Sequence, residues 1–294
     1  MKILIIGGSS FIGTNMTRSF SKNNDVKYSY FTNKPEIQNG FKLDIRNKEE
    51  TKEFLKEHSS DIVIISTALT NVDLCETSSN LANSINVQGT QNIVDACKEF
   101  QNKIVFISTS AVFDGRKSLY DEEDKPNPTS VYGSTKFEAE EIVRESGNPY
   151  LILRTDQPYG WKENWHHTNS VLRVIENLKY GKSFKEITNW HNSPTYVPDF
   201  IHTVEKLLKG NYEGIFHLVG SDFINRFQWA LTVANVFNFK KELIEKIDSS
   251  ELDLSVKRTN VHLSNKKVEE KINHKMIGVE EGAKMMFKEY QNFN

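Results

Sequence analysis

The chain has 294 residues, which is enough for one large domain or for two domains that share a cleft. Its 37 Lys and Arg residues are balanced by 39 Asp and Glu residues, so the formal net charge is -2. Proteins that bind nucleic acids or anionic membranes usually have a clear basic excess. The composition therefore predicts neither a nucleic-acid partner nor a membrane partner.

Two cysteines, Cys75 and Cys97, are too few for a disulfide framework or a four-thiolate zinc site. They indicate ordinary reduced thiols and a cytoplasmic location. No apolar run reaches the roughly 18 residues that a membrane span needs. The apolar run Ile3–Ile6 ends at Gly7, too early for a signal peptide, so a buried strand is expected there.

Short apolar runs alternate with amphipathic stretches in the first half of the chain. Five segments are apolar or rich in β-branched and aromatic residues and are predicted to be strands: 2–6, 26–31, 62–65, 104–107 and 150–153. Four longer segments have helical spacing of their apolar residues: 12–21, 47–58, 81–100 and 129–146. This order predicts an α/β fold, a Rossmann-type doubly wound parallel sheet with helices on both faces.

The alternation becomes irregular after Arg154. One further strand at 194–200 and one further helix at 202–209 would return to the first domain. The chain would then divide into a dinucleotide-binding domain and a smaller mixed α/β domain that binds the substrate: 1–154 with about 188–210, and about 155–187 with 211–294.

A glycine-rich turn follows the first predicted strand and opens the first predicted helix. Glycines permit close approach of the backbone to a pyrophosphate, and a helix N-terminus offers free N–H groups and a favourable dipole. The context is typical of a dinucleotide-binding turn, with Ser10 at the midpoint between Gly7 and Gly13. Six residues of this turn are expected to bind the cofactor: Gly7, Ser9, Ser10, Phe11, Ile12 and Gly13.

The end of the second predicted strand has no acidic residue. NAD-preferring proteins usually have one there, because it binds the 2′-hydroxyl of the ribose. The chain instead continues as Thr32, Asn33 and Lys34, and the first acid is Glu36. We therefore predict that these three residues contact the cofactor and that NADP(H) is preferred, with Lys34 pairing with the 2′-phosphate. The alternative is that Lys34 is one more solvated lysine.

Tyr132 and Lys136 are four residues apart in a predicted helix, so their side chains share one face. A neighbouring ammonium lowers the pKa of a phenol, which otherwise lies near 10. Thr109 follows the buried strand 104–107, at the edge where open parallel sheets bind ligands. A hydroxyl there would hydrogen-bond a substrate carbonyl. Tyr132 and Lys136 alone would also fit a solvated helix pair, and Thr109 favours the catalytic interpretation.

These motifs resemble the extended short-chain dehydrogenases, and within that family they are most similar to the dTDP-4-dehydrorhamnose reductases. The resemblance covers nearly the whole chain and includes Asn86–Thr90, Ile107–Gly115, Tyr132–Lys136, Ser193–Asp199 and Phe216–Gly220. It implies a catalytic triad of Thr109, Tyr132 and Lys136. It also implies four further contacts to the cofactor besides those of Tyr132 and Lys136: Asp44, Ile45, Thr67 and Ala68.

The chain departs from the reductase pattern where the substrate is expected. Ser110 and Ala111 stand where the reductases usually have Asp-Tyr and where nucleotide-sugar dehydratases have Asp-Glu, so dehydration is not expected. Gln157 lies where the reductases usually have a tryptophan. Six residues are expected to contact the substrate: Thr70, Val72, Ser110, Ala111, Gln157 and Trp161. No metal site is predicted, because His166 and His167 have no partner at ligand spacing.

The resemblance predicts reduction of a keto group on a nucleotide-activated deoxysugar, with NADP as cofactor, although NAD is an alternative. A second interpretation is a nucleotide-sugar epimerase that retains NAD. A third is a non-catalytic NADP-binding subunit, like the reductase-like regulatory subunit of methionine adenosyltransferase. The expected partners are the nucleotide sugar and a second copy of the chain in a homodimer.

Overall fold

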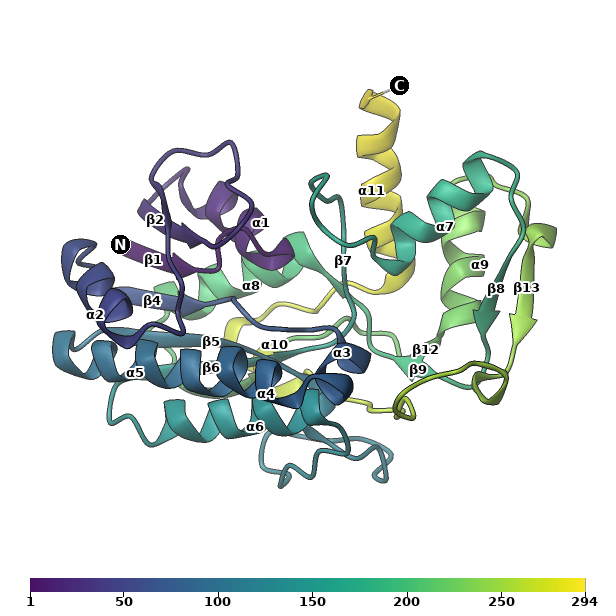
Figure 1. Cartoon of the computed structure of the whole chain (residues 1–294). Coiled ribbons are helices and arrows are strands. Elements are labelled where there is room, and N and C mark those ends of the chain that lie inside the picture. Colours follow the sequence, from purple (N-terminus) through teal and green to yellow (C-terminus); the bar gives the residue numbers. More distant parts are fainter. Residues whose placement is uncertain (294) are drawn as a thin grey trace. The chain divides into compact units, whose positions relative to one another are not determined.

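A seven-stranded sheet forms the centre of the first of two compact units in this computed structural model, which describes residues 1–293 (Figure 1). The strand order is β11-β6-β5-β4-β1-β2-β3. The pairs from β3 through β5 are parallel. The strands have these bounds: β1 Lys2–Ile6, β2 Asp25–Tyr30, β3 Gly40–Lys42, β4 Ile62–Ile65, β5 Lys103–Thr109, β6 Tyr150–Thr155 and β11 Gly214–His217.

Strand order reverses between β1 and β4, as in doubly wound folds. Helix α1 (Phe11–Phe20) covers one face of the sheet, whereas α2 (Lys48–Glu57), α5 (Gly89–Phe100) and α6 (Val131–Arg144) lie on the other face (Figure 1). The Rossmann-type fold that the sequence predicted is confirmed. Its core consists of the apolar strand residues and the inner helix faces, including Leu4, Ile6, Val63, Ile65, Ile93, Val94, Ile104, Phe106, Val143 and Ile152.

Two predicted elements differ from the structure. The single helix predicted at 81–100 is divided into α4 (Ser79–Ala82), a π-helical turn η1 (Asn83–Gln88) and α5. Apolar periodicity over one turn does not distinguish the two kinds of helix, whose hydrogen bonds differ by one residue. The strand predicted at 194–200 was wrong. Only Thr195–Tyr196 is extended, as β10, and α8 (Val197–Lys209) begins directly after it. Proline is favoured in a first helical turn, where its missing N–H is not needed, so Pro198 fits there.

The second unit contains residues 114–124, 155–203 and 217–294. It has three two-stranded sheets: β7 (Pro158–Tyr159) with β10, β9 (His191–Asn192) with β12 (Ile224–Asn225), and β8 (Phe184–Ile187) with β13 (Ile244–Ile247). Its helices are α7 (Ser170–Lys179), α9 (Arg226–Val236), α10 (Lys266–Ile272) and α11 (Val279–Phe293). A core around Trp229, Leu172 and Met286 joins α7, α9 and α11.

The unit boundaries lie at other residues than the sequence suggested. The segment that returns to the first unit is 204–216, and the loop 114–124 groups with the second unit. The first of these boundaries falls inside α8, where no loop or composition change marks it. No helix within residues 1–293 is long and apolar enough to cross a membrane.

Candidate active site

The glycine-rich turn between β1 and α1 is tightly held by its own backbone and by serines. Ser10 caps α1, because its hydroxyl accepts a hydrogen bond from the N–H of Gly13 at 3.0 Å. The same hydroxyl lies 2.9 Å from the hydroxyl of Ser66 after β4. The N–H of Gly7 donates to the Ser29 hydroxyl at 3.0 Å. The turn therefore opens a helix whose first N–H groups have no acceptor within the helix, which suits a pyrophosphate.

Gly13 leaves no room for a side chain. A Cβ at this position would lie 2.2 Å from the carbonyl oxygen of Gly7, a backbone atom that cannot move without opening the turn. The bond between Gly13 and the capping hydroxyl of Ser10 would also be disturbed. The close packing that the sequence suggested for this turn is thus present, with Ser10 as a capping residue.

We expect Gly13→Ala to weaken NADPH binding by about tenfold or more, since overpacking against backbone distorts the turn. Fluorescence titration of the purified protein with NADPH measures this directly. Arg18→Ala, which removes an exposed side chain near the other end of α1, is the matched control and should bind normally. Unchanged affinity in Gly13→Ala would show that the turn does not hold the pyrophosphate.

The segment after β2 is anchored by hydrogen bonds from a buried tyrosine. The hydroxyl of Tyr28 donates to the carbonyl oxygens of Pro35 at 3.1 Å and Ile37 at 2.8 Å. Burial raises the pKa of Tyr28, so it stays a donor. Thr32, Asn33 and Lys34 are exposed in this segment, and the Lys34 ammonium lies 5.9 Å from the centre of the Tyr30 ring.

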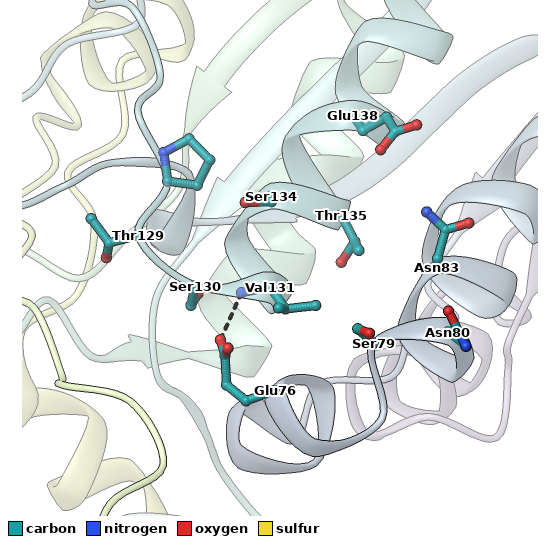
Figure 2. A pocket seen from close by; sticks show the side chains of 11 residues that line it. Glu76, Ser79, Asn80, Asn83, Thr129, Ser130, Val131, Ser134, Thr135 and Glu138 are labelled. Atoms are coloured by element: carbon teal, nitrogen blue, oxygen red, sulfur yellow. Dashed lines mark hydrogen bonds between the residues drawn. The ribbon is translucent and has the colours of Figure 1, made fainter.

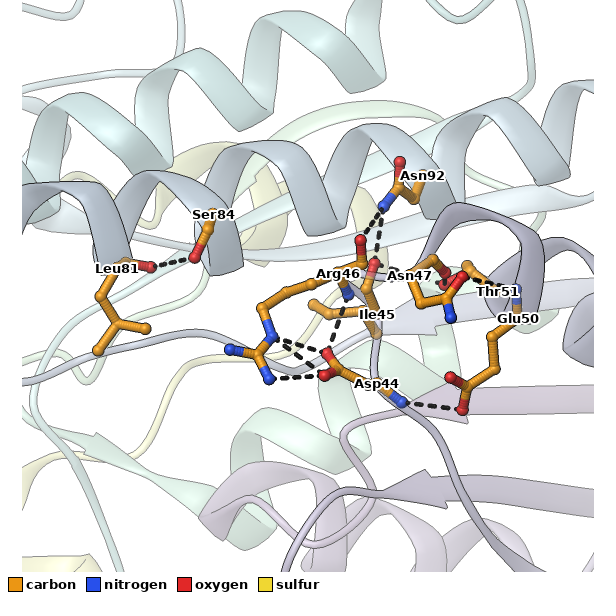
Figure 3. Close-up of polar contacts among 9 residues, drawn as sticks. All are labelled: Asp44, Ile45, Arg46, Asn47, Glu50, Thr51, Leu81, Ser84 and Asn92. Atoms are coloured by element: carbon orange, nitrogen blue, oxygen red, sulfur yellow. Dashed lines mark hydrogen bonds and ion pairs between the residues drawn. The ribbon is translucent and has the colours of Figure 1, made fainter.

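Asp44 and Ile45 lie in a turn between β3 and α2 (Figure 3). The Arg46 side chain donates to both carboxylate oxygens of Asp44, at 2.8 Å and 2.6 Å. These hydrogen bonds hold the pKa of Asp44 below its usual range. The buried amide of Asn92 on α5 donates to the carbonyl oxygen of Ile45 at 2.9 Å. The turn is therefore fixed by Arg46 within it and by Asn92 on α5.

Asn86 joins the loop after β4 to α6. Its side-chain oxygen accepts from the N–H of Leu69 at 2.7 Å, and its amide donates to the Leu69 carbonyl at 3.1 Å and to the Thr135 hydroxyl at 3.1 Å. Asn86 is 2% exposed and lies within the π-helical turn η1. Such turns often occur at functional sites. Along the chain, Thr67 and Ala68 precede Leu69, to which Asn86 is bonded, and Thr70 and Val72 follow it.

Thr109 is the last residue of β5, and a short 3₁₀ turn, η2 (Ser110–Val112), follows it. The Thr109 hydroxyl accepts from the N–H of Ala111 at 3.2 Å. The first turn of α6 packs directly on this segment, because a Cβ at Gly133 would lie 2.2 Å from the carbonyl oxygen of Ala111. The structure thus brings the end of β5 and the start of α6 together, which the sequence predicted from Thr109 and Tyr132.

Tyr132 and Lys136 are placed differently with respect to solvent. Tyr132 is half-buried in the first turn of α6, whereas Lys136 is 3% exposed. The Lys136 ammonium donates to the carbonyl oxygen of Ile107 at 2.7 Å and lies 3.8 Å from the centre of the Phe106 ring. Burial lowers the pKa of Lys136 to about 7, and the carboxylate of Glu140 acts in the opposite direction.

A pocket of about 580 Å³ lies on another face of α6, between α6 and the segment of α3 (Val72–Thr77) and α4 (Figure 2). Glu76 accepts a hydrogen bond from the N–H of Val131 at 2.7 Å and so caps α6 together with Ser130. The pocket is lined by Ser79, Asn80, Asn83, Ser134, Thr135 and Glu138, among others, but not by Tyr132 or Lys136. This pocket therefore lies apart from Tyr132 and Lys136, on a polar face of α6.

Two residues expected at the substrate lie in the second unit. Gln157 has a φ of 39° and accepts a hydrogen bond from the Arg226 guanidinium at 2.8 Å. Arg226 is itself held between the rings of Trp190 and Trp229. Trp161 stacks on Tyr290, with ring centres 6.2 Å apart. In the second unit, the side chain of Gln157 is thus held by a hydrogen bond from Arg226, which the sequence analysis did not single out.

Several residues of the site were not predicted from the sequence. They are polar and at least partly buried, and they bond to backbone or side chains elsewhere in the chain: Ser29, Asn92, Glu140 and Arg226. For Glu140 a signal existed, since an acid at this spacing from Lys136 interrupts the buried face of α6. For Asn92, the only signal was an amide in an otherwise apolar helix stripe.

A family model decides the assignment, because the model described as RmlD substrate binding domain matches residues 1–292. The chain belongs to this family. The expected relation to extended short-chain dehydrogenases, most similar to dTDP-4-dehydrorhamnose reductase, is thereby confirmed.

Similar proteins agree with this. The dTDP-4-dehydrorhamnose reductase of Bacillus anthracis, solved in complex with NADP, is 27% identical, has a TM-score of 0.88 and covers 98% of this chain and 100% of its own. A dTDP-4-dehydrorhamnose reductase of Aggregatibacter actinomycetemcomitans is 30% identical over 198 residues, 65% of this chain and 66% of that protein. Methionine adenosyltransferase 2 subunit beta of Bos taurus is 24% identical over 258 residues, 85% of this chain and 76% of that protein.

Proposed function

We propose that the chain is an NAD(P)H-dependent reductase of a keto group on a nucleotide-activated deoxysugar. The observation that carries the proposal is the packing of the first turn of α6 on the end of β5, which places Tyr132 and Thr109 on adjacent segments beside the sheet edge. Membership of the RmlD family supports it, since reductases of 4-dehydrorhamnose are among its close relatives. The enzyme class is accordingly an oxidoreductase.

The cofactor is NADP, as in the Bacillus anthracis relative, and the residues of this chain fit it. The turn at Gly13 has close backbone packing that a Cβ would disrupt, as a pyrophosphate-binding turn requires. Thr32, Asn33 and Lys34 include no acidic side chain that would repel a 2′-phosphate. When bound, NADPH supplies the hydride. Asp44 and Ile45 are the residues expected to hold the adenine, and Lys136 the nicotinamide ribose.

The reducing step needs a proton as well as a hydride. Tyr132 would donate it to the carbonyl oxygen as a general acid. Lys136 would favour the resulting phenolate and so lower the pKa of the tyrosine. The hydroxyl of Thr109, at the end of β5, would hydrogen-bond the same carbonyl oxygen and stabilise the charge that builds there. Ser110, Ala111, Thr70, Val72, Gln157 and Trp161 remain the proposed contacts to the sugar nucleotide.

The test is a cofactor-oxidation assay of the purified chain against a panel of keto-sugar nucleotides, with NADPH and NADH compared by their Michaelis constants. We expect NADPH-dependent turnover of at least one 4-keto-6-deoxy sugar. Protein that is purified with tightly bound NAD and interconverts sugar epimers would show an epimerase instead. Stoichiometric NADP binding without turnover of any keto sugar would favour a non-catalytic NADP-binding subunit.

We also propose a homodimer and a cytoplasmic location. The homodimer follows from family resemblance, and the location follows from the need of a reductase for a supply of reduced cofactor. Light scattering of the purified chain tests the first of these proposals, and microscopy of a tagged chain tests the second.

A further inference from the structure

Three functional groups follow one another along a single face of α6. Tyr132, Lys136 and Glu140 are spaced four residues apart, so each lies about one turn beyond the one before. Exposure falls along this face: Tyr132 is half-buried, Lys136 is 3% exposed and Glu140 is 0% exposed. Along this face, burial therefore increases from the N-terminal turn of α6 toward its middle.

The carboxylate of Glu140 is rigidly anchored. Arg154 on β6 donates to one of its oxygens from Nε at 3.0 Å and to the other from Nη2 at 2.6 Å. The hydroxyl of Ser108, next to Thr109 on β5, donates to the first oxygen. Arg154 is 1% exposed, and its guanidinium lies 5.0 Å from the centre of the Phe113 ring. With this set of donors, the buried carboxylate of Glu140 has one defined position.

Among the described residues, no carboxylate is in direct contact with the buried ammonium of Lys136. Its own bonds are to a neutral carbonyl and a ring face, at Ile107 and Phe106. Tyr132 and Glu140 share its face of α6, and Glu140 is in turn bound by Arg154 on β6. Burial disfavours the ammonium, and Glu140 is the charge that opposes this effect. One carboxylate thus faces two buried cations, only one of which it binds directly.

We propose that Glu140 is a positioning residue of the proton-transfer unit: its carboxylate, fixed by Ser108 and Arg154, keeps Lys136 charged beneath Tyr132. The part of this proposal that concerns proton transfer to a substrate rests on the proposed function. Glu140 touches neither the substrate nor the cofactor, and it acts through Lys136. A purely structural Glu140 would serve only as the partner of Arg154, and the two roles predict different results.

The experiment compares Glu140→Gln with Arg154→Met. Both variants break the same buried ion pair, but the first removes the negative charge near Lys136 and the second leaves it in place. Titration of lysine side chains by NMR reports the ionisation of Lys136, whose signal is assigned by its absence in Lys136→Met. We expect the titration midpoint of Lys136 to fall by about one pH unit or more in Glu140→Gln. In Arg154→Met it should stay or rise, because Arg154 no longer offsets the negative charge of Glu140.

An unchanged midpoint in Glu140→Gln, or an equal fall in both variants, would overturn the proposal. If Glu140→Gln does not fold because Arg154 is left unpaired, the double variant Glu140→Gln with Arg154→Met is compared with Arg154→Met alone. The midpoint should again be lower without Glu140, and equality would again overturn the proposal. None of these readings needs a substrate, so their failure is distinct from the absence of reductase activity in the native chain, which would reject the proposed function.

Discussion

Tyr132→Phe should lower the turnover of keto-sugar reduction by about 10³-fold, because it removes the proton donor from the reacting oxygen. The ring remains, so the packing of the first turn of α6 on Ala111 should not change. Binding of NADPH should therefore be largely retained. The measurement is steady-state turnover with the best substrate of the panel, together with a fluorescence titration of the cofactor.

The matched control for Tyr132→Phe is Tyr180→Phe, which removes a phenol hydroxyl from a tyrosine that is 71% exposed. It should keep native turnover. Turnover of Tyr132→Phe within a few-fold of native would exclude Tyr132 as the proton donor. Loss of NADPH binding in the same variant would show that the hydroxyl serves the cofactor site as well.

Lys136→Met should make the protein more stable and inactive at the same time. The pKa of Lys136 is lowered to about 7 by burial, whereas an unfolded lysine titrates near 10. Below pH 7 the lysine is charged in both states, and the folded protein carries the full unfavourable burial of the charge. As the pH rises toward 10, only the unfolded chain binds the proton, so native stability rises over this range.

The expected gain in the free energy of unfolding for Lys136→Met is therefore largest near pH 6, up to about 4 kcal/mol, and smaller near pH 9. Denaturant unfolding at the two pH values measures it. Lys42→Met, which removes an exposed lysine of β3, should change stability little at either pH. A gain that is equal at both pH values would contradict an ionisation effect, and a loss would show that the bonds of Lys136 to Ile107 and Phe106 outweigh its burial.

The sheet could be predicted from the sequence because its strands are covered on both faces. All four residues of a run such as Ile62–Ile65 are apolar and buried. Such a run predicts a strand covered on both faces even when its neighbours in the sheet are unknown. The turn around Gly13 and the Tyr132–Lys136 pair could also be identified as candidates, since each is local in the chain. The parallel sheet with helices on both faces also followed, because predicted strands and helices alternate along the chain.

Contacts between distant residues could not be predicted in the same way. Asn92 bonds a carbonyl 47 residues earlier, and Asn86 bonds a hydroxyl 49 residues later. Nothing in the spacing of these amides shows what they bind. The start of α8 was missed for a different reason: β-branched and aromatic residues at 195–197 favour a strand, and Pro198 and Asp199 reverse that preference by suiting a first helical turn.

Because Asn86 lies in the π-helical turn Asn83–Gln88, the direction of its side chain depends on the number of residues in this turn as well as on their types. An α-helix advances by about 100° per residue, so one residue removed from this turn would restore regular winding and rotate everything before it about the axis of α5. The amide that joins Leu69 to Thr135 would then point elsewhere, although no residue of the triad had changed. The spacing of the chain between the loop after β4 and α5 is thus as much a part of the site as the side chains that line it.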